Sequence, residues 1–485
     1  MTCQLPADCL NEIFEYLAED KISLRSCLLV NRSWCEVAVR IFWRNIFSIN
    51  HREHIPLSTL RTIIACLPNE SKELIYFNEI VVRNPILNPP IFNYLSFVKV
   101  LSIYTIGQII EDALRNRQID SPQSLYFIKY LMLQELLKGF MSQISSLKSL
   151  DYNLRLDTVQ YMPFSYFPGA KDCLKDLTEF RCDSNIYPEF CFQISQICHN
   201  IQSLTIEFKN NVSDGLKDLI TFQVDLEYLN LIAFDDKDWK DIIPALTKHH
   251  NRLTKLHIHT DKENVTFSFI ALFENLQELL ISDNCSDRYI SDFDELQNVI
   301  FPKLRILKIP DRYPQIEIFT KFLENNGSNL VELTLADVHK SVKLSISRFC
   351  PILKKLYVLF EKDEMNILKD ILDSCQYLES IKVWCGHNFL NEKELLEVIA
   401  SYSPKNFNEL KIYNDTRSEL IHQDMESFFL SWGNRIPHRP LNLFVIKNNG
   451  GYSLALDVNE ENIITIEKYR KLGVIKKFGI ENFDY

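Results

Sequence analysis

The chain has 485 residues, of which 46% are apolar, and its net charge is −11. The acidic balance argues against non-specific DNA binding as the main activity, because contacts to phosphates need a basic surface. No apolar run reaches the length of a membrane span, and the residues after Met1 do not resemble a secretory leader. Thirteen cysteines without a C-x-x-C pair are typical of free thiols in a reducing compartment. We therefore expect a soluble protein of the cytoplasm, the nucleus or both.

Residues 1–47 predict three short helices. The first is expected to open at Pro6, because proline suits the first helical position. Ser23 is a candidate N-cap for the second helix, and Ser33 begins the capping-box spacing of the third. Three helices of this length bury little among themselves, so part of their apolar surface must meet something else.

This N-terminal segment resembles an F-box. The resemblance consists of a Leu-Pro start, an apolar face in the first helix, a Leu-x-Val-Asn-x-x-Trp segment and a closing Trp followed by Ile-Phe. These features are Leu5, Pro6, Ile13, Phe14, Leu17, Leu28, Val30, Asn31, Trp34, Trp43, Ile46 and Phe47. Asp8 stands where the family often has glutamate, and both acids suit a helix N-terminus. The resemblance covers about a tenth of the chain.

The resemblance implies that residues 1–47 bind a Skp-type adaptor, which joins the protein to a cullin in a ubiquitin ligase. The residues that it assigns to adaptor binding are Leu5, Pro6, Leu10, Ile13, Phe14, Leu28, Val30 and Trp34. The alternative is that the three helices only cap the repeats that follow, since a solenoid needs such caps at its ends.

Residues 48–95 predict a connector that is partly helical. Prolines punctuate it on both sides of one helical stretch, 58–67. The segment 98–103 is expected to form a first strand, and residues 106–145 are expected to be helical.

From there to the C-terminus one motif recurs, apolar-x-x-apolar-x-apolar. Its copies are Leu147/Leu150/Tyr152, Leu177/Phe180/Cys182, Ile201/Leu204/Ile206, Leu226/Leu229/Leu231, Leu253/Leu256/Ile258, Leu276/Leu279/Ile281, Leu304/Leu307/Ile309, Leu330/Leu333/Leu335, Leu353/Leu356/Val358, Leu378/Ile381/Val383, Phe407/Leu410/Ile412, Leu441/Phe444/Ile446 and Ile475/Phe478/Ile480. Between Leu204 and Leu410 the central positions are 23 to 29 residues apart. That period is typical of a leucine-rich repeat with a helix in each unit. The last two apolar residues share one face of a strand, and stacking the strands buries that face.

Amphipathic segments such as 363–375 and 392–403 predict the helices between these strands. We therefore predict an α/β fold, a leucine-rich-repeat solenoid (horseshoe) over residues 96–485 that ends in a C-terminal cap and is preceded by a small three-helix F-box. The combination resembles the F-box/leucine-rich-repeat proteins, notably the large fungal sets. The alternative is one long α/β domain, but an open parallel sheet would not need a dozen copies of one template.

The remaining candidate sites favour packing over chemistry. Cys198, Cys350 and Cys375 each precede a motif by three residues, which resembles the cysteine-containing subtype of leucine-rich repeat, where the thiol packs at a helix end. His257 and His259 flank a core residue on a strand, so they share the face opposite the core. No nucleotide-binding or hydrolase motif occurs. We expect no catalytic residues, no cofactor and no metal.

The residues that flank each motif's last apolar position face away from the core, and in three late repeats they are aromatic or basic. The predicted target-binding residues are Tyr357, Lys382, Trp384, Lys411 and Tyr413. Aromatic side chains are typical binding anchors, and the two lysines favour an acidic or phosphorylated segment. The alternative is that the C-terminal cap folds over these side chains.

Taken together, the sequence predicts the substrate-recognition subunit of a Skp-cullin-F-box ubiquitin ligase, with an unknown target protein and no nucleic-acid or membrane partner. The alternative is a leucine-rich-repeat interaction scaffold without a role in a ligase.

Overall fold

The computed structural model divides into two compact units, residues 1–228 with 244–248 and residues 229–243 with 249–485. It describes residues 5–47, 55–77, 90–115, 121–153, 162–209, 211–234, 237–261, 265–284, 289–290, 292–335, 338–447 and 456–482. The predicted F-box lies in the first unit, together with the first four strands. The predicted domain boundaries after residues 47 and 95 stay predictions.

The first unit begins with helices and continues as alternating strands and helices. Its helices are α1 (Ala7–Glu15), α2 (Lys21–Cys27), α3 (Arg32–Arg44), α4 (Leu57–Cys66), α5 (Asn69–Phe77), α6 (Ile103–Leu114), α7 (Pro122–Gln143), α8 (Ala170–Leu174), α9 (Pro188–Ile197) and α10 (Asp214–Phe222). Its strands are β1 (Val100–Ser102), β2 (Ser149–Tyr152), β3 (Glu179–Asp183) and β4 (Ser203–Phe208), with the 3-10 turns η1 (Tyr94–Phe97) and η2 (Phe164–Tyr166). The four strands pair in parallel and in chain order.

The first three helices begin at other residues than the sequence predicts. Pro6 precedes α1 as its N-cap. The Asp20 carboxylate caps α2 by accepting from the Ser23 backbone N–H at 3.0 Å, and the Asn31 side chain caps α3. The predicted caps Ser23 and Ser33 are wrong, since both serines lie inside the first turn of their helices. The side chains of Asp20 and Asn31, each three residues before the N–H that it accepts from, take the capping position instead.

The second unit repeats the same alternation. Its strands are β6 (Lys255–Thr260), β7 (Glu278–Asp283), β8 (Ile306–Ile309), β9 (Glu332–Leu335), β10 (Lys355–Tyr357), β11 (Ser380–Cys385), β12 (Glu409–Asn414), β13 (Leu441–Lys447) and β14 (Ile475–Asn482). Its helices are α12 (Ile316–Asn326), α13 (Lys340–Phe349), α14 (Met365–Ser374), α15 (Glu392–Tyr402), α16 (His422–Gly433) and α17 (Glu460–Lys471). The 3-10 turns are η5 (Ser268–Leu272), η6 (Asp294–Leu296), η7 (Gly327–Asn329) and η8 (Leu456–Val458). Four elements lie at or near the division between the units, β5 (Tyr228–Ala233), η3 (Lys240–Ile242), α11 (Ile243–Leu246) and η4 (Thr247–His249).

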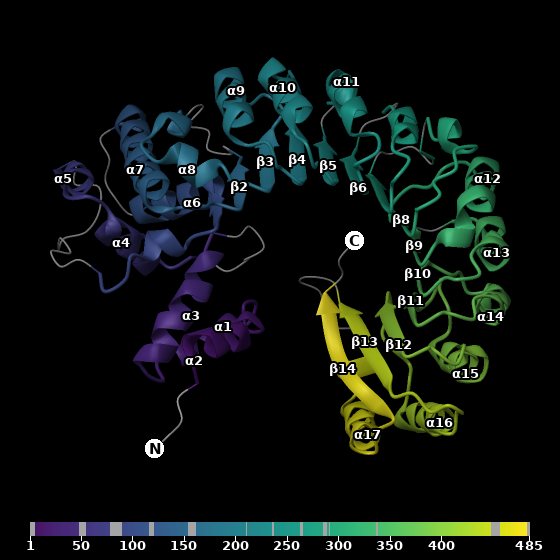
Figure 1. The fold of residues 1–485 in the computed structure, drawn as a ribbon. Helices are drawn as coiled ribbons and strands as arrows, with labels where there is room; N and C mark the ends of the chain where they lie inside the picture. The colour runs from purple at the N-terminus through teal and green to yellow at the C-terminus, as the bar shows by residue number, and fades with distance from the viewer. Residues whose placement is uncertain are drawn as a thin grey trace. The chain divides into compact units, whose positions relative to one another are not determined.

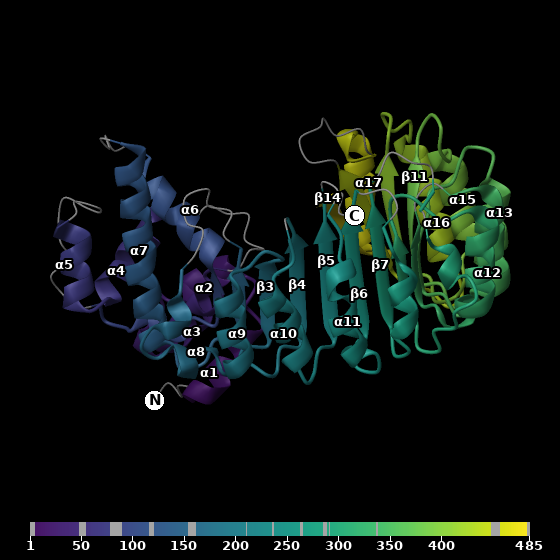
Figure 2. The ribbon, with the colours of Figure 1, turned by 90° about the horizontal axis from the view of Figure 1, so that it is seen from above.

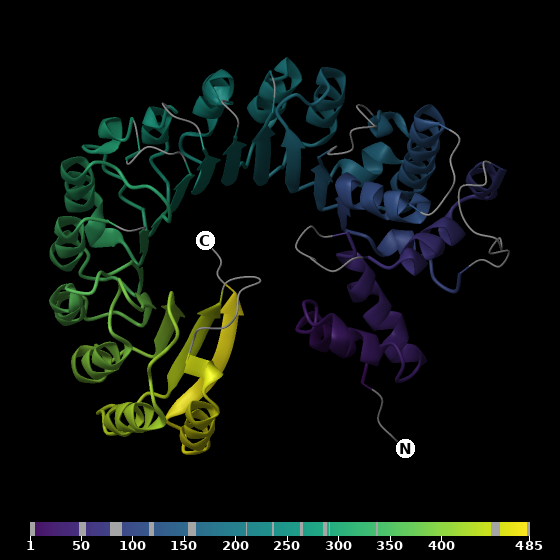
Figure 3. The ribbon, with the colours of Figure 1, turned by 180° about the vertical axis from the view of Figure 1, so that it is seen from behind.

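In each unit the helices cover one face of the parallel strands. Helices α9 and α10 lie beside β3 and β4 in the first unit (Figure 2). In the second unit α12–α17 lie outside the strands, whose other face is open (Figures 1 and 3). Among the described residues, the segments between β6 and β8 contain 3-10 turns and no α-helix, so the predicted helix in every repeat is wrong there. These connections still bury Phe269 and Leu296 in the core.

The motif residues of most strands fill the core between strands and helices, as the sequence predicts, but Phe478 and Ile480 of the last motif stay partly exposed. Along β6 and β7 buried and partly exposed residues alternate, with Leu256, Ile258, Leu279 and Ile281 fully buried. The cysteines pack as expected, because the buried Cys198 thiol donates to the Leu174 carbonyl at 3.0 Å.

The motif at β13 is one residue out of register. The structure pairs Leu410 with Leu443 and Ile412 with Val445, so Leu443 and Val445 continue the core. Phe444, which the sequence places in the core beside Ile446, therefore lies on the open face of the sheet. A one-residue shift exchanges the two faces of a strand, and here both faces are apolar and buried, so the pattern gives no warning.

Candidate binding surfaces

Helices α1–α3 enclose a small core of their own. Its buried members are Leu10, Phe14, Leu24, Cys27, Val37, Ala38 and Ile41. Phe14 meets Trp34 edge to face, with 5.1 Å between ring centroids. Because Leu10 and Phe14 are buried in this core, they support the predicted adaptor surface from below and do not form it. Leu28 and Trp34 pack on the same core and are only partly buried.

The other predicted adaptor residues lie on the surface. Leu5, Ile13 and Val30 are about half exposed, and Pro6, which follows Leu5, is exposed as well. The structure adds three exposed apolar residues that the sequence reading did not select, Tyr16, Ile22 and Leu29. Leu29 is 88% exposed, next to the partly buried Leu28. A count of apolar residues beyond those the three helices can bury is the only sequence signal that points to them.

The end of α3 anchors these helices to the first strand and its neighbours. Trp43 packs on Tyr94 with 4.7 Å between ring centroids, and Phe47 packs on Phe140 at 5.5 Å. The Arg44 carbonyl accepts from the Lys99 backbone N–H at 2.9 Å, directly before β1. The three helices are therefore held in place by the packed core of the first unit.

The Arg44 guanidinium also ties α3 to α1. It donates two hydrogen bonds of 2.8 Å to the Glu15 carboxylate. These hydrogen bonds lower the pKa of Glu15. A two-point contact of this kind fixes the angle between the helices as well as their distance.

On the open face of the second unit, the five predicted target-binding residues come together on β10, β11 and β12. In the register of the sheet Tyr357, Lys382 and Lys411 form one row, and Trp384 and Tyr413 lie side by side in the next row. The Trp384 and Tyr413 rings are 4.2 Å apart between centroids. All five side chains stay partly exposed, although the C-terminal strands contact Lys411.

Charge on this surface is more balanced than the sequence predicts. Lys411 donates to a Glu481 carboxylate oxygen of β14 at 2.7 Å and lies over the Phe444 ring at 5.0 Å. Burial, with the nearby carboxylates, raises the pKa of Tyr357 to about 12, so its phenol stays protonated at neutral pH. We call Tyr357, Lys382, Trp384, Lys411 and Tyr413 the aromatic–lysine surface.

A cleft of about 540 Å³ opens next to this surface, at the ends of β11 and β12. Phe389 lines the cleft and also contacts Trp384, with 5.5 Å between ring centroids. The Glu392 carboxylate in its wall is buried and accepts from Asn414 at 2.7 Å and from Ser418 at 2.8 Å. Burial raises the pKa of Glu392 against the effect of these hydrogen bonds. The cleft thus extends the aromatic–lysine surface with a polar recess.

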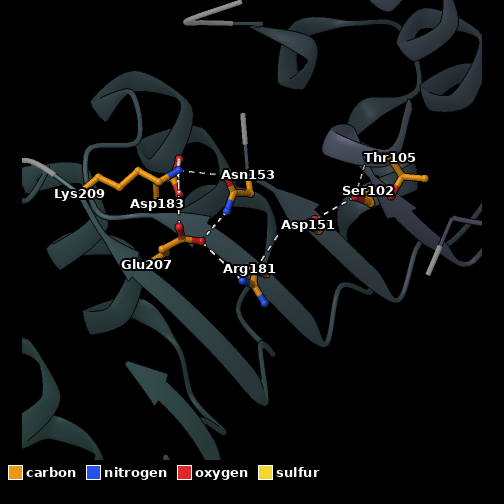
Figure 4. Close-up of polar contacts among 8 residues, drawn as sticks. All are labelled: Ser102, Thr105, Asp151, Asn153, Arg181, Asp183, Glu207 and Lys209. Atoms are coloured by element: carbon orange, nitrogen blue, oxygen red, sulfur yellow. Dashed lines mark hydrogen bonds and ion pairs between the residues drawn. The ribbon is translucent and has the colours of Figure 1, made fainter. Parts of the chain in front are cut away.

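A network of charged side chains occupies the open face of β2–β4 (Figure 4). Arg181 lies between Asp151 and Glu207, with nitrogen–oxygen distances of 3.9 and 3.5 Å. Lys209 contacts Asp183 at 3.0 Å and Asn153 at 3.2 Å. None of these residues is among the candidate sites that the sequence predicts, because its pattern does not show which charged side chains of neighbouring strands meet.

The network also reaches the start of α6. Ser102 donates to a carboxylate oxygen of Asp151 at 2.8 Å and accepts from the Thr105 backbone N–H, which caps α6 (Figure 4). Burial raises the pKa of Asp151 although Ser102 and Arg181 oppose that shift. Each charge in this network has a partner of opposite charge, so the face of β2–β4 is polar without a strong net charge.

Comparison with protein families supports the assignment of the N-terminal helices. The F-box-like family profile matches residues 2–49, a range that contains α1–α3. The N-terminus of this chain is therefore an F-box-like domain. A search of curated proteins found no match.

Comparison with solved structures gives distant likenesses, of which two are described. One is the yeast Rad7 and Elc1 complex, at 12% identity and a TM-score of 0.40, with 97% of this chain and 91% of that chain covered. The other is the Drosophila Toll–Spatzle complex, at 13% identity and a TM-score of 0.29, with 66% and 50% covered. Within the described part of the chain, no helix is long and apolar enough to cross a membrane.

Proposed function

We propose that this chain is the substrate-recognition subunit of a Skp-cullin-F-box ubiquitin ligase. The observation that carries the proposal is the F-box-like match over residues 2–49, where the described residues leave six large apolar side chains at the surface. These are Leu5, Ile13, Tyr16, Ile22, Leu29 and Val30. Apolar side chains gathered on so small a domain suit a stable interface with an adaptor.

The repeats supply the second half of the proposal. Strands alternate with helical segments, the motif has a period of 23 to 29 residues between Leu204 and Leu410, and the strand pairs within β1–β4 and within β6–β14 are parallel and join neighbours in sequence. We assign them to the leucine-rich-repeat class on that basis. Such repeats present an open face for binding.

The target binds at the aromatic–lysine surface in this proposal. Trp384 and Tyr413 form a partly exposed aromatic pair, and aromatic side chains dominate binding energies at interfaces. Adjacent strands lie about 4.8 Å apart, so three strands suit a short peptide segment better than a broad surface. Lys411 is already paired with Glu481, so we assign the main contribution to the rings.

The chain would contribute proximity and no chemistry of its own. Holding target lysines near a charged conjugating enzyme raises their effective concentration, which is enough to accelerate transfer. The adaptor and a cullin are the partners that this role requires. The cytoplasm, the nucleus or both are the compartments that we propose for it.

Co-purification of the full chain from cell extract tests the proposal. A substrate receptor captures a Skp-type adaptor, a cullin and one or more targets, whereas an interaction scaffold without a ligase role captures neither adaptor nor cullin. Trp384→Ala should remove the targets, at a cost of about 2 kcal/mol or more in binding, and leave the adaptor in place. Tyr377→Ala, which removes an exposed ring elsewhere in the same unit, is the matched control. Targets that remain with Trp384→Ala would move the binding site away from this surface.

A further inference from the structure

Strand β14 has an unpaired edge in the part of the chain that the structure describes. It pairs with β13 on one side, and the order of strands ends with it (Figures 1 and 3). At eight residues it is longer than any other described strand. Such an edge presents a row of backbone N–H and C=O groups that readily pairs with another strand.

The side chains of β14 differ between its two faces. Lys477, Gly479 and Glu481 lie on the open face, since the register places them beside the outward residues of β13. Phe478 and Ile480 lie on the helix side. Phe478 is partly exposed and Ile480 is 54% exposed, so the described residues leave apolar area uncovered at this edge.

We propose that β14 pairs in antiparallel fashion with β14 of a second copy of this chain, around a two-fold axis at Gly479. In that register Lys477 of each copy is opposite Glu481 of the other, and Phe478 is opposite Ile480. Directly opposed residues of an antiparallel pair share a face, so the ion pairs form on the open face and the apolar pairs on the helix side. The same surface serves both copies, as two-fold symmetry requires.

Other registers lose these contacts. Moving the axis to Phe478 or Ile480 places a charged residue opposite Gly479, and both ion pairs disappear. A shift that pairs odd with even positions would join opposite faces of the sheet, which a continuous sheet does not allow. Of these registers, only the one centred on Gly479 gives complementary side-chain pairs between two antiparallel copies of β14.

Two further features suit this pairing. One oxygen of the Glu481 carboxylate accepts from Lys411 at 2.7 Å, which leaves its other oxygen for Lys477 of the second copy. Glycine within a strand often marks the close approach of another backbone. Here a Cβ on Gly479 would also lie 3.1 Å from the Phe444 ring, so the ring would have to shift by a few tenths of an ångström to admit one.

The mass of the full chain in solution tests the proposal. Light scattering after size exclusion should give twice the 57.0 kDa of one chain when the protein concentration is raised to about 100 µM. Lys477→Glu alone and Glu481→Lys alone should each be monomeric, because like charges then face each other twice. An equimolar mixture of the two variants should restore the dimer, since one chain then carries glutamate at both positions and the other carries lysine at both, so both ion pairs form again. A folding defect would not be rescued by mixing.

Ile480→Asp and Leu430→Asp form a matched pair for the apolar contact. Both residues are exposed to a similar extent, 54% and 55%, but only Ile480 lies at the edge strand. Ile480→Asp should be monomeric and Leu430→Asp dimeric. A wild-type chain that stays at 57.0 kDa would overturn the proposal. Lys476 and Lys477 would then be charges that prevent another strand from pairing with this edge. A dimer that survives Ile480→Asp, or that mixing fails to restore, would equally overturn the proposal.

Discussion

Asp151 is the residue at which burial and charge conflict most directly. Its carboxylate is buried on the open face of β2 and has a raised pKa, because burial outweighs the hydrogen bond from Ser102 and the charge of Arg181. The carboxylate is therefore harder to form in the folded chain than in the unfolded chain. Its charge lowers the free energy of unfolding once the pH rises through the folded pKa, and it has no such effect below the unfolded value.

We predict that Asp151→Asn is more stable than the wild type at pH 7. Asparagine keeps an acceptor for Ser102 and removes the buried charge. The advantage should shrink as the pH falls toward about 4, the ordinary pKa of aspartate. Urea unfolding at several pH values measures it, with the exposed Asp172→Asn as a control that should change stability by less than about 0.5 kcal/mol. A less stable Asp151→Asn at pH 7 would mean that the ion pair with Arg181 outweighs the burial.

At the scale of the element, α3 has two roles. Its first half closes the core of the F-box-like domain, and the residues at and just beyond its end pack on Tyr94 and Phe140. Removal of residues 1–47 would therefore strip both rings of their partners and damage the first unit. Single substitutions are the cleaner probe of adaptor binding.

We predict that Phe47→Ala lowers the free energy of unfolding of the full chain by about 3–5 kcal/mol. Phe47 is fully buried against Phe140, so the substitution leaves a cavity. Phe222→Ala, at a residue of the same unit that is 48% exposed, should cost far less. Denaturant unfolding followed by circular dichroism compares the two. Equal losses would show that the end of α3 is not anchored as described.

The sequence predicts the repeated elements well because each strand combines a regular period with clear alternation. Both signals fail at β13, where apolar residues occupy both faces and the inward positions become ambiguous. Neither signal predicts contacts between residues that are far apart in the sequence. Lys411 and Glu481 are 70 positions apart, so only the structure reveals that they pair.

The candidate sites divide in the same way. The family resemblance selects Leu5, Ile13 and Val30, which the structure places on the surface, and it also selects Leu10 and Phe14, which the structure buries. A sequence motif contains both the residues that form a domain's core and the residues that bind its partner, and does not distinguish them. Only a folded structure separates the two groups.

For the whole molecule, the proposed functions support one another. A receptor that dimerises through β14 carries two adaptor surfaces and two aromatic–lysine surfaces. Two linked binding events raise the apparent affinity for a target with two suitable segments, provided that both sites can be reached together. The dimer and the receptor role are tested separately, because the variants at β14 leave the F-box-like domain unchanged.

The measurement that tests the receptor role most directly is the affinity of the purified full chain for a purified Skp-type adaptor, by calorimetric titration. The wild-type chain should bind. Leu29→Asp should weaken binding at least about tenfold, or about 1.4 kcal/mol, because it places a charge on an exposed apolar residue of the F-box-like domain. Ile436→Asp, at a residue of the second unit with a similar exposure of 91%, should bind as the wild type does. A wild-type chain that shows no binding, or a Leu29→Asp chain that binds equally well, would contradict the account.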